Sequence, residues 1–535
     1  TCTSQGWDEL IDAVRTANPN RVLIGACLPY AYSQKLKELG EAVRLDSKLM
    51  EVVDIRTPPF SGSVEDIHPE SGDEKREKIN ERVAGSIESI LQMGISRLKH
   101  AQPLQTPKIR IIQKALVIGG GIAGITAALG IANDGFSVDL VEKSDRLGGN
   151  LNWINKTIDG SDTGAFLNDL TNQVGKHPNI EVHLNTSVAG SYGQVGRFYT
   201  TLQDEQGEIK NISHGATILA TGGKEAETKE FGYGNFTCVL SQKDLETKLY
   251  EKAIDLEEIS SVVMIQCVGS RQEPRNYCSR VCCSSALKNA IHLKQLNPDM
   301  NIYVLYRDIM SYGFLENYYT QARKAGIIFI PYSLDRKPEI RLPEKAGGET
   351  ENSEVTVNAF EPIIGKILEI RADLLILATG IIPDLPVDLA KSYGAGVDQD
   401  GFFMEAESKW RPVDSLAEGV FSCGLSLGPR SIPESIATAQ AAAQRANRIL
   451  QREWLPAGKI VAEVRQSLCS LCERCIEACP YGARSVDIDQ EKILINPARC
   501  QGCGACAAIC PNSASIVSGG GDRQMMEVID AAIYG

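Results

Sequence analysis

Two cysteine runs near the end of the chain constrain its fold more than any other feature. Each has three cysteines at intervals of three residues and a fourth followed by proline. They are Cys469-x2-Cys472-x2-Cys475-x3-Cys479-Pro480 and Cys500-x2-Cys503-x2-Cys506-x3-Cys510-Pro511. Three closely spaced thiolates on a tight loop can bind three irons of a 4Fe–4S cubane, and the fourth iron needs a thiolate from another direction. We therefore expect residues 456–535 to form a domain that binds two 4Fe–4S clusters.

The fourth cysteine of each run is the candidate ligand for the cluster of the other run. Bacterial two-cluster ferredoxins, which this stretch resembles, share their ligands in this way. The resemblance implies a ferredoxin-like α+β domain in which Cys479 joins the second cluster and Cys510 joins the first. The alternative is a pair of structural zinc sites, because C-x2-C also binds zinc. Two four-cysteine runs that each end in Cys-Pro favour clusters over zinc.

Composition limits the class of protein. The chain has 535 residues, too many for one ordinary core, so we expect about three domains. Its net charge of −13 argues against nucleic acid as a partner. Half of the sixteen cysteines crowd into the two runs, and no charged-then-apolar leader is seen, so we expect reduced, metal-bound cysteine in the cytoplasm. The uncharged stretch Ala115 to Ala132 contains a strand–turn–helix pattern, so we expect no membrane span.

The order of strand-like and helix-like segments predicts three domains. Residues 1–105 read as a small α/β domain. Residues 108–455 alternate strands and helices, which predicts an α/β domain with a largely parallel sheet. Within it, Lys337 to Ser353 reads as a surface loop and Ser435 to Leu450 as the closing helix. Residues 456–535 are the cysteine-rich domain.

A glycine fingerprint near residue 120 predicts a dinucleotide site. Gly119, Gly121 and Gly124 form G-x-G-x-x-G directly after a strand and at the head of a helix. They would allow the tight turn, the approach of the backbone to a pyrophosphate, and close helix–strand packing. Glu142 ends the next strand and can bind the adenosine ribose hydroxyls.

Three further features indicate that the dinucleotide is FAD. They are typical of flavoproteins with two dinucleotide-binding domains, such as thioredoxin and glutathione reductases, which this region resembles. The resemblance assigns cofactor-binding roles to Gly148, Gly149 and Asn150, to Ala220, Thr221, Gly222, Thr379 and Gly380 of two A-T-G segments, and to Gly424 and Ser435. Such reductases also carry a redox cysteine pair early in the domain and a second glycine fingerprint for NAD(P)H. Here no cysteine occurs between Cys27 and Cys238, and Cys267 stands where the second fingerprint should begin.

A third group of cysteines follows that position. Cys267, Cys278, Cys282 and Cys283 lie within seventeen residues, among three arginines. Free cysteine is often buried and unreactive, so a core role is the alternative. Four thiols in so short a span favour a third 4Fe–4S cluster.

The whole pattern resembles the A subunits of heterodisulfide reductases. The resemblance covers most of residues 110–518 and rests on GGGIAGI, QCVGSR…YCSRVCC…LKNA, SLGPRSIPESIATAQ and the ferredoxin run. It implies that the third group binds an unusual cluster near FAD, and that the matching lysine, Lys288, approaches flavin N5 as a catalytic residue. A solvated helix lysine is the alternative for Lys288.

The resemblance also implies partners and an activity. The protein would be a homodimer in a larger complex, taking electron pairs from a hydrogenase, a formate dehydrogenase or a ferredoxin donor. It would split or merge them between ferredoxin and a disulfide-reducing partner, which is electron bifurcation or confurcation. Two alternatives remain: an NAD(P)H-dependent flavin oxidoreductase resembling the small subunit of glutamate synthase, and a non-catalytic scaffold with relic cofactor sites.

The chain departs from the family in two places. Long members carry a second ferredoxin module inside the flavin domain, whereas the stretch from Val182 to Thr217 has neither the room nor the cysteines for one. Cys2 and Cys27 lie where the family has a cluster-bearing N-terminal domain. Two cysteines cannot complete a cubane alone, so a fourth cluster would need further ligands.

Overall fold

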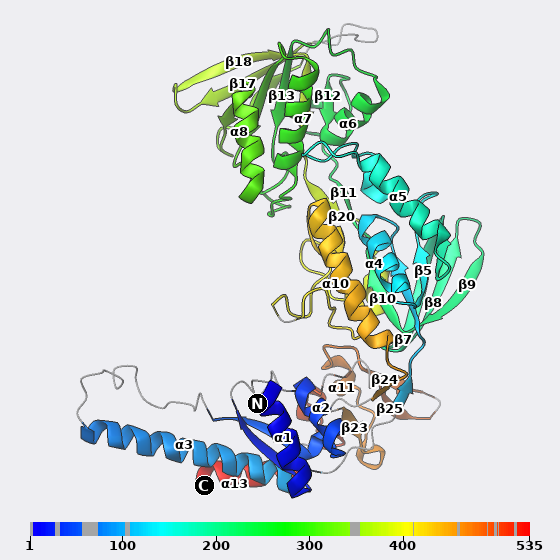
Figure 1. Cartoon of the computed structure of the whole chain (residues 1–535), viewed down its shortest axis with the longest axis vertical. Coiled ribbons are helices and arrows are strands. Elements are labelled where there is room, and N and C mark those ends of the chain that lie inside the picture. The colour runs from blue at the N-terminus through cyan, green and yellow to red at the C-terminus, as the bar shows by residue number, and fades with distance from the viewer. Residues whose placement is uncertain are drawn as a thin grey trace. The chain divides into compact units, whose positions relative to one another are not determined.

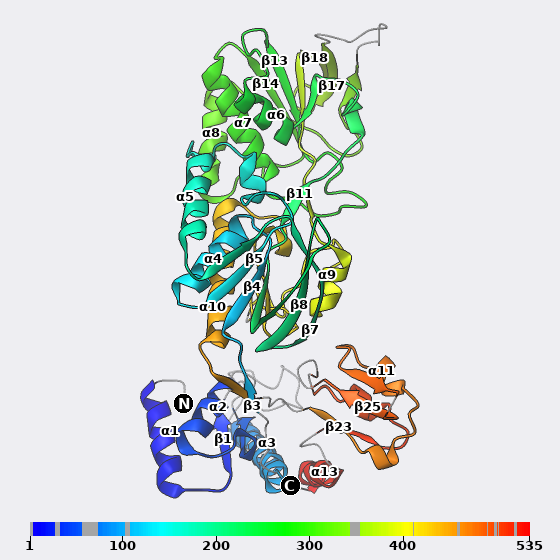
Figure 2. The ribbon, with the colours of Figure 1, turned by 90° about the vertical axis from the view of Figure 1, so that its right-hand side faces the viewer.

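The structure is a computed structural model of the chain. It describes residues 4–26, 33–55, 73–101, 108–342, 354–409, 411–456, 461–488, 490–496, 500, 502–517 and 522–534. They form two compact units: Ile109–Leu455, and Thr1–Lys108 with Pro456–Gly535 (Figures 1 and 2). The division of the second unit into separate N-terminal and ferredoxin-like domains stays a prediction. Two short strands, β3 (Lys108–Arg110) and β22 (Trp454–Pro456), contain the points of the chain at which one unit ends and the other begins.

The first half of Ile109–Leu455 is built on a parallel sheet of five strands. Its order is β21 (Val420–Ser422), β10 (Ala216–Leu219), β4 (Lys114–Ile118), β5 (Ser137–Val141) and β6 (Ile180–His183). Helices α4 (Ile122–Asn133) and α10 (Ile432–Leu450) pack on each other and on the sheet, and α5 (Thr163–Lys176) packs on α4. The strands are apolar along nearly their whole length because both faces of such a sheet are covered.

The second half repeats this plan. Its parallel sheet has the order β12 (Val239–Ser241), β19 (Leu374–Leu377), β13 (Ser261–Ile265), β14 (Asn301–Tyr306) and β15 (Ile328–Pro331). Its helices are α6 (Gln242–Glu251), α7 (Cys282–Leu296) and α8 (Glu316–Lys324), with α7 and α8 packed together (Figure 1). The antiparallel pair β11 (Gly223–Glu225) and β20 (Ile381–Pro383) links the halves. Two consecutive parallel sheets confirm the expected fold with two dinucleotide-binding domains.

Each half also carries a small antiparallel sheet. The first is β7 (Thr186–Gln194), β8 (Arg197–Asp204) and β9 (Ile209–His214), which fills the stretch where long relatives were expected to have a ferredoxin module. The second is β16 (Glu339–Arg341), β17 (Val355–Glu361) and β18 (Lys366–Ala372). Strand β16 corrects the expected surface loop from Lys337 to Ser353, because its residues pair with β17; residues 343–353 lie outside the described part. Helix α9 (Val387–Tyr393) packs on β7.

Helix α10 begins earlier than the sequence suggested. It starts at Ile432 rather than at Ser435, because Ser431 and Glu434 form a capping box and Pro433 lies in the first turn. In the described residues, no helix is both long and apolar enough to cross a membrane. The uncharged stretch Ala115 to Ala132 is divided between β4 and α4, as expected.

The other unit contains a small α/β part and a cysteine-rich part. The α/β part has the parallel strands β1 (Val22–Ala26) and β2 (Met50–Asp54), with helices α1 (Ser4–Ala17), α2 (Ser33–Val43) and α3 (Asp73–Lys99). The cysteine-rich part has two antiparallel pairs, β23 (Ala462–Val464) with β26 (Ser515–Val517) and β24 (Arg484–Asp487) with β25 (Lys492–Ile495). Its helices are α11 (Arg474–Glu477), α12 (Ala505–Ala508) and α13 (Asp522–Tyr534), and α13 packs on α3.

Candidate functional site

The three fingerprint glycines have the geometry that their proposed roles require. Gly119 has φ +109°, and a Cβ there would lie 2.2 Å from the Ala220 carbonyl oxygen. A Cβ on Gly124 would lie 1.7 Å from the Gly119 carbonyl oxygen, so only glycine lets α4 pack this closely. A Cβ on Gly121 would meet only the Gly149 Cα, at 4.0 Å. The turn is therefore rigid where it packs and open where a pyrophosphate would approach.

The segment after β5 closes this turn. Glu142 is buried, and its Oε2 accepts from the Gly120 N–H at 2.6 Å. The Gly148 N–H donates to the Gly120 carbonyl oxygen at 2.8 Å. Gly148 and Gly149 both have positive φ, and Asn150 Nδ2 donates to the Gly223 carbonyl oxygen at 2.9 Å. The structure thus brings this group of predicted FAD residues into one cradle at the carboxyl end of the first sheet.

The remaining predicted FAD residues fall into two places. In the first half, Thr221 Oγ1 is buried without a hydrogen-bond partner in the described residues, which fits a site that a bound group would complete. The Gly424 N–H donates to Thr438 Oγ1 of α10 at 3.0 Å. The Ser435 N–H donates to the Ser431 carbonyl oxygen at 2.9 Å, so its amide is already used inside the helix. The first turn offers few free amides, because Pro433 has none and the Glu434 N–H donates to Ser431 Oγ at 3.4 Å. The predicted contact of Ser435 with FAD stays a prediction.

The second A-T-G segment lies in the other half. Thr379 and Gly380 follow β19, and a Cβ on Gly380 would lie 2.5 Å from Ser270 Oγ and 2.7 Å from Ser279 Oγ. Both serines belong to the loop that carries the third cysteine group. The structure places these two residues against that loop, and their predicted contact with FAD stays a prediction.

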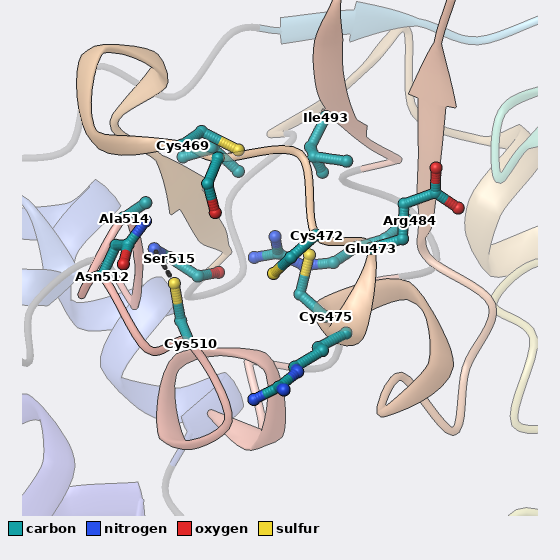
Figure 3. Close-up of a pocket in the computed structure, with 13 residues that line it drawn as sticks. Cys469, Cys472, Glu473, Cys475, Arg484, Ile493, Cys510, Asn512, Ala514 and Ser515 are labelled. Carbon is teal, nitrogen blue, oxygen red and sulfur yellow. Dashed lines mark hydrogen bonds between the residues drawn. The ribbon is translucent and has the colours of Figure 1, made fainter.

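The eight ferredoxin-type cysteines line two cavities, and each cavity takes three cysteines from one run and the last from the other. The first, about 350 Å³ including space open to solvent, is lined by Cys469, Cys472, Cys475 and Cys510 (Figure 3). The second, about 320 Å³ on the same measure, is lined by Cys500, Cys503, Cys506 and Cys479. This crossed grouping is the one that the spacing predicted.

Backbone amides surround the sulfurs of both cavities. The Ala483 N–H donates to Cys479 Sγ at 3.3 Å, and the Ser515 N–H donates to Cys510 Sγ at 3.4 Å. Burial opposes ionisation of Cys510, but the surrounding backbone N–H groups outweigh it and lower the pKa of this thiol. Such N–H···S bonds favour the thiolate form that a metal site needs.

The sulfurs are spaced too widely for a single zinc ion. Among the described residues, no three cysteine sulfurs lie within 4.8 Å of one another. A tetrahedral zinc ion about 2.3 Å from each sulfur would hold the sulfurs about 3.8 Å apart. A larger group such as a 4Fe–4S cubane suits the observed spacing better. The three metal-ligand side chains that do approach this closely are Asp139, Glu181 and His183, where Lys114 Nζ already balances Asp139 at 2.7 Å.

The third cysteine group lies at the carboxyl end of β13. Cys267 follows the strand with φ +59°, and Cys282 and Cys283 are the first two residues of α7. Burial raises the pKa of Cys283 to about 11, and burial together with the neighbouring thiols raises that of Cys282. The Arg280 N–H donates to Cys278 Sγ at 3.3 Å. The four thiols are thus neighbours. A metal cluster bound there would supply the positive charge that stabilises their thiolate forms.

Burial alone does not distinguish this group from core cysteines. Cys238 and Cys423 are also buried, and burial raises the pKa of Cys423 to about 12. These two lie in different hydrophobic clusters, whereas the four thiols of the third group act on one another electrostatically. The closeness of these four thiols favours their being the ligands of one metal cluster. Cys2 and Cys27 lie outside the described residues.

Lys288 lies two turns into α7 and is not a solvated lysine. Its side chain is 11% exposed, and Nζ lies 2.5 Å from Glu246 Oε1 on α6. Nζ also donates to the Lys156 carbonyl oxygen at 3.1 Å, in the chain segment that follows the FAD cradle. Sequence reasoning did not identify Glu246, because the pair is 42 residues apart in the chain.

A second contact missed by sequence reasoning links the third cysteine group to α10. Arg280 Nη2 lies 2.5 Å from Glu434 Oε1, and the other carboxylate oxygen of Glu434 accepts from the Ser431 N–H. The pair is separated by 154 residues. The cysteine loop and the helix proposed to face the flavin are therefore held together by one ion pair.

Comparison with known proteins agrees with this geometry. The 4Fe-4S dicluster domain family matches residues 462–511, and the NAD(P)-binding Rossmann-like domain family matches residues 117–167. Among solved structures, a thioredoxin reductase of T. acidophilum aligns with 63% of this chain and 99% of its own, at 16% identity and a TM-score of 0.45.

The curated relatives match over nearly the whole chain. The A subunit of the H(2):CoB-CoM heterodisulfide,ferredoxin reductase of Methanothermobacter marburgensis is 29% identical over 582 residues, covering 91% of this chain and 84% of the relative. A protein of Archaeoglobus profundus that is named as similar to heterodisulfide reductase A subunits is 29% identical over 620 residues, covering 90% and 85%. Over about nine-tenths of its length, the chain is therefore similar in sequence to heterodisulfide reductase A subunits.

Proposed function

We propose that the chain is the electron-transfer subunit of a heterodisulfide reductase-like complex and carries one FAD and three 4Fe–4S clusters. The observation that carries the proposal is the crossed grouping of eight cysteines around two neighbouring cavities. Two clusters in one small domain would form a path for single electrons. Electrons would pass between this domain and the flavin half.

The residues of the flavin half fit the same role. The glycine turn and Glu142 would bind the dinucleotide, and FAD would supply the exchange between electron pairs and single electrons. The third cysteine group stands at the carboxyl end of the second sheet, which is where ligands bind in doubly wound folds. There Cys282 and Cys283 occupy the helix N-terminus that would otherwise face the phosphates of NAD(P)H.

The activity that we propose for this arrangement is electron bifurcation or confurcation. An electron pair would enter from a hydrogenase, a formate dehydrogenase or a ferredoxin donor. It would leave as single electrons by separate cluster paths, one toward ferredoxin and one toward a disulfide-reducing partner. The names of the relatives couple hydrogen, ferredoxin and the CoB-CoM heterodisulfide, which supports this class of partners.

The isolated chain is expected not to be reduced by NADH or NADPH. The reason is that Cys267 replaces the first glycine of the second dinucleotide turn, and α7 begins with two cysteines instead of a free phosphate site. The measurement is anaerobic stopped-flow mixing of the purified chain with each nucleotide while flavin absorbance is followed. A strong chemical reductant is the positive control. Rapid flavin bleaching by micromolar NADPH would instead favour the alternative, a flavin oxidoreductase like the small subunit of glutamate synthase.

A further inference from the structure

Arg484 occupies a position between the two cysteine cavities. It is the first residue of β24, is 6% exposed, and lines both cavities. No other residue in the described part is shared by the two linings. A group at this position can act on whatever occupies either cavity.

Among the described residues, no carboxylate or carbonyl group pairs with the Nη atoms of Arg484. Neither Nη1 nor Nη2 has a hydrogen-bond partner in the part of the chain that the structure describes. A buried guanidinium is normally paired with a carboxylate or bound to several carbonyl oxygens. A buried cation left without such partners indicates that its counter-charge belongs to a group that binds there.

The cysteine sulfurs of the two cavities are the groups that this charge reaches. Arg484 lines the first cavity together with Cys475 and Cys510, which come from different runs. It lines the second cavity together with Cys479 and Cys500. Its charge therefore lies beside the ligand sets of both cavities.

The internal repeat supplies this charge only once. Arg484 follows Cys479 by five residues, and the residue at the matching position after Cys510 is Ser515. Ser515 is also buried, but it lines only the first cavity. The two runs thus provide one buried positive charge shared by the two cavities, and not one for each.

We propose that Arg484 is the fixed positive charge that raises the reduction potentials of the 4Fe–4S clusters in the two cavities. This inference rests on the proposed function, since it requires that the cavities hold clusters. A cluster bound by four thiolates is negatively charged and becomes more so when it takes up an electron. A nearby buried cation stabilises the reduced form, and net charge around the sulfurs is one of the factors that set cluster potentials.

The test is the replacement of Arg484 by methionine, which fills similar space without a charge or a polar group. Midpoint potentials are measured in the full chain by anaerobic redox titration followed by electron paramagnetic resonance. The equilibrium constant for one-electron reduction of the clusters is expected to fall at least tenfold, about 59 mV for such a couple. Arg484→Lys, which keeps the charge, is expected to stay within threefold of the parent.

Arg474→Met is the matched control. Arg474 lines the first cavity but is exposed, so water screens its charge and its loss is expected to change the equilibrium less than threefold. A parent chain without iron and acid-labile sulfide would refute the proposed function itself. A parent with clusters whose potentials are unchanged in Arg484→Met would overturn only the role of Arg484. Loss of a cluster in Arg484→Met but not in Arg484→Lys would show that the charge is needed to bind the cluster. Loss of a cluster in both Arg484→Met and Arg484→Lys would show that Arg484 is needed for packing. Either result overturns the tuning role.

Discussion

Replacing Cys503 with alanine is expected to remove one 4Fe–4S cluster from the chain and to leave FAD bound. Cys503 is an exposed member of the second cavity, so the substitution removes a ligand without opening the core. The flavin cradle belongs to the other compact unit, and its residues are untouched. Iron content should fall by roughly four atoms per chain while flavin absorbance is unchanged. Iron and acid-labile sulfide analysis beside flavin spectroscopy measures both.

Cys238→Ala is the matched control for this variant. Cys238 is a buried thiol in the hydrophobic core of the second half and belongs to none of the three cysteine groups. Its loss should leave the iron content at the parental value. Full iron content in Cys503→Ala, or equal losses in the two variants, would show that the second cavity does not bind a cluster through Cys503.

Lys288→Ala is expected to abolish coupled reduction in the assembled complex while FAD and all clusters remain. An ammonium in a partly dry site strongly stabilises the negative charge that arrives with an electron pair. The variant should therefore shift the flavin potentials in an anaerobic titration and uncouple the two reductions in the complex. It should also lower the free energy of unfolding by about 3–5 kcal/mol, because the Glu246 carboxylate would be left buried without its partner.

A double variant separates these two effects. Lys288→Met with Glu246→Gln removes both charges, so the uncompensated carboxylate is gone and much of the lost stability should return. If Lys288 acts on the flavin, coupling stays lost in the double variant. If the double variant recovers coupling together with stability, Lys288 is a structural partner of Glu246 and other residues control the flavin.

Local patterns in the sequence predicted those parts of the site that depend on neighbouring residues. The spacing within each cysteine run and the glycine turn from Gly119 to Gly124 are local, and each constrains its own loop. The start of α10 was misplaced at Ser435, although the Ser431-x-x-Glu434 capping box was present in the sequence and gives the correct start. Strand β16 was missed because three residues with little apolar pattern pair only in the presence of β17.

The missed contacts depend on tertiary structure. The partner of Lys288 is on α6, and the partner of Arg280 is on α10, so neither carboxylate could be chosen from one sequence. The position of Arg484 between two cavities follows from the packing of the two cysteine runs on each other, which the spacing within a run does not determine. In each case a charged residue that looks ordinary in the sequence is placed by the fold beside a candidate cofactor site.

The cofactor content of the anaerobically purified chain tests the central claim most directly. We expect one non-covalent FAD, roughly twelve irons and roughly twelve acid-labile sulfides per chain, which corresponds to three 4Fe–4S clusters. Flavin release by denaturation, iron and sulfide assays and metal analysis on one sample give all three numbers. A chain that contains zinc and no acid-labile sulfide would contradict the account.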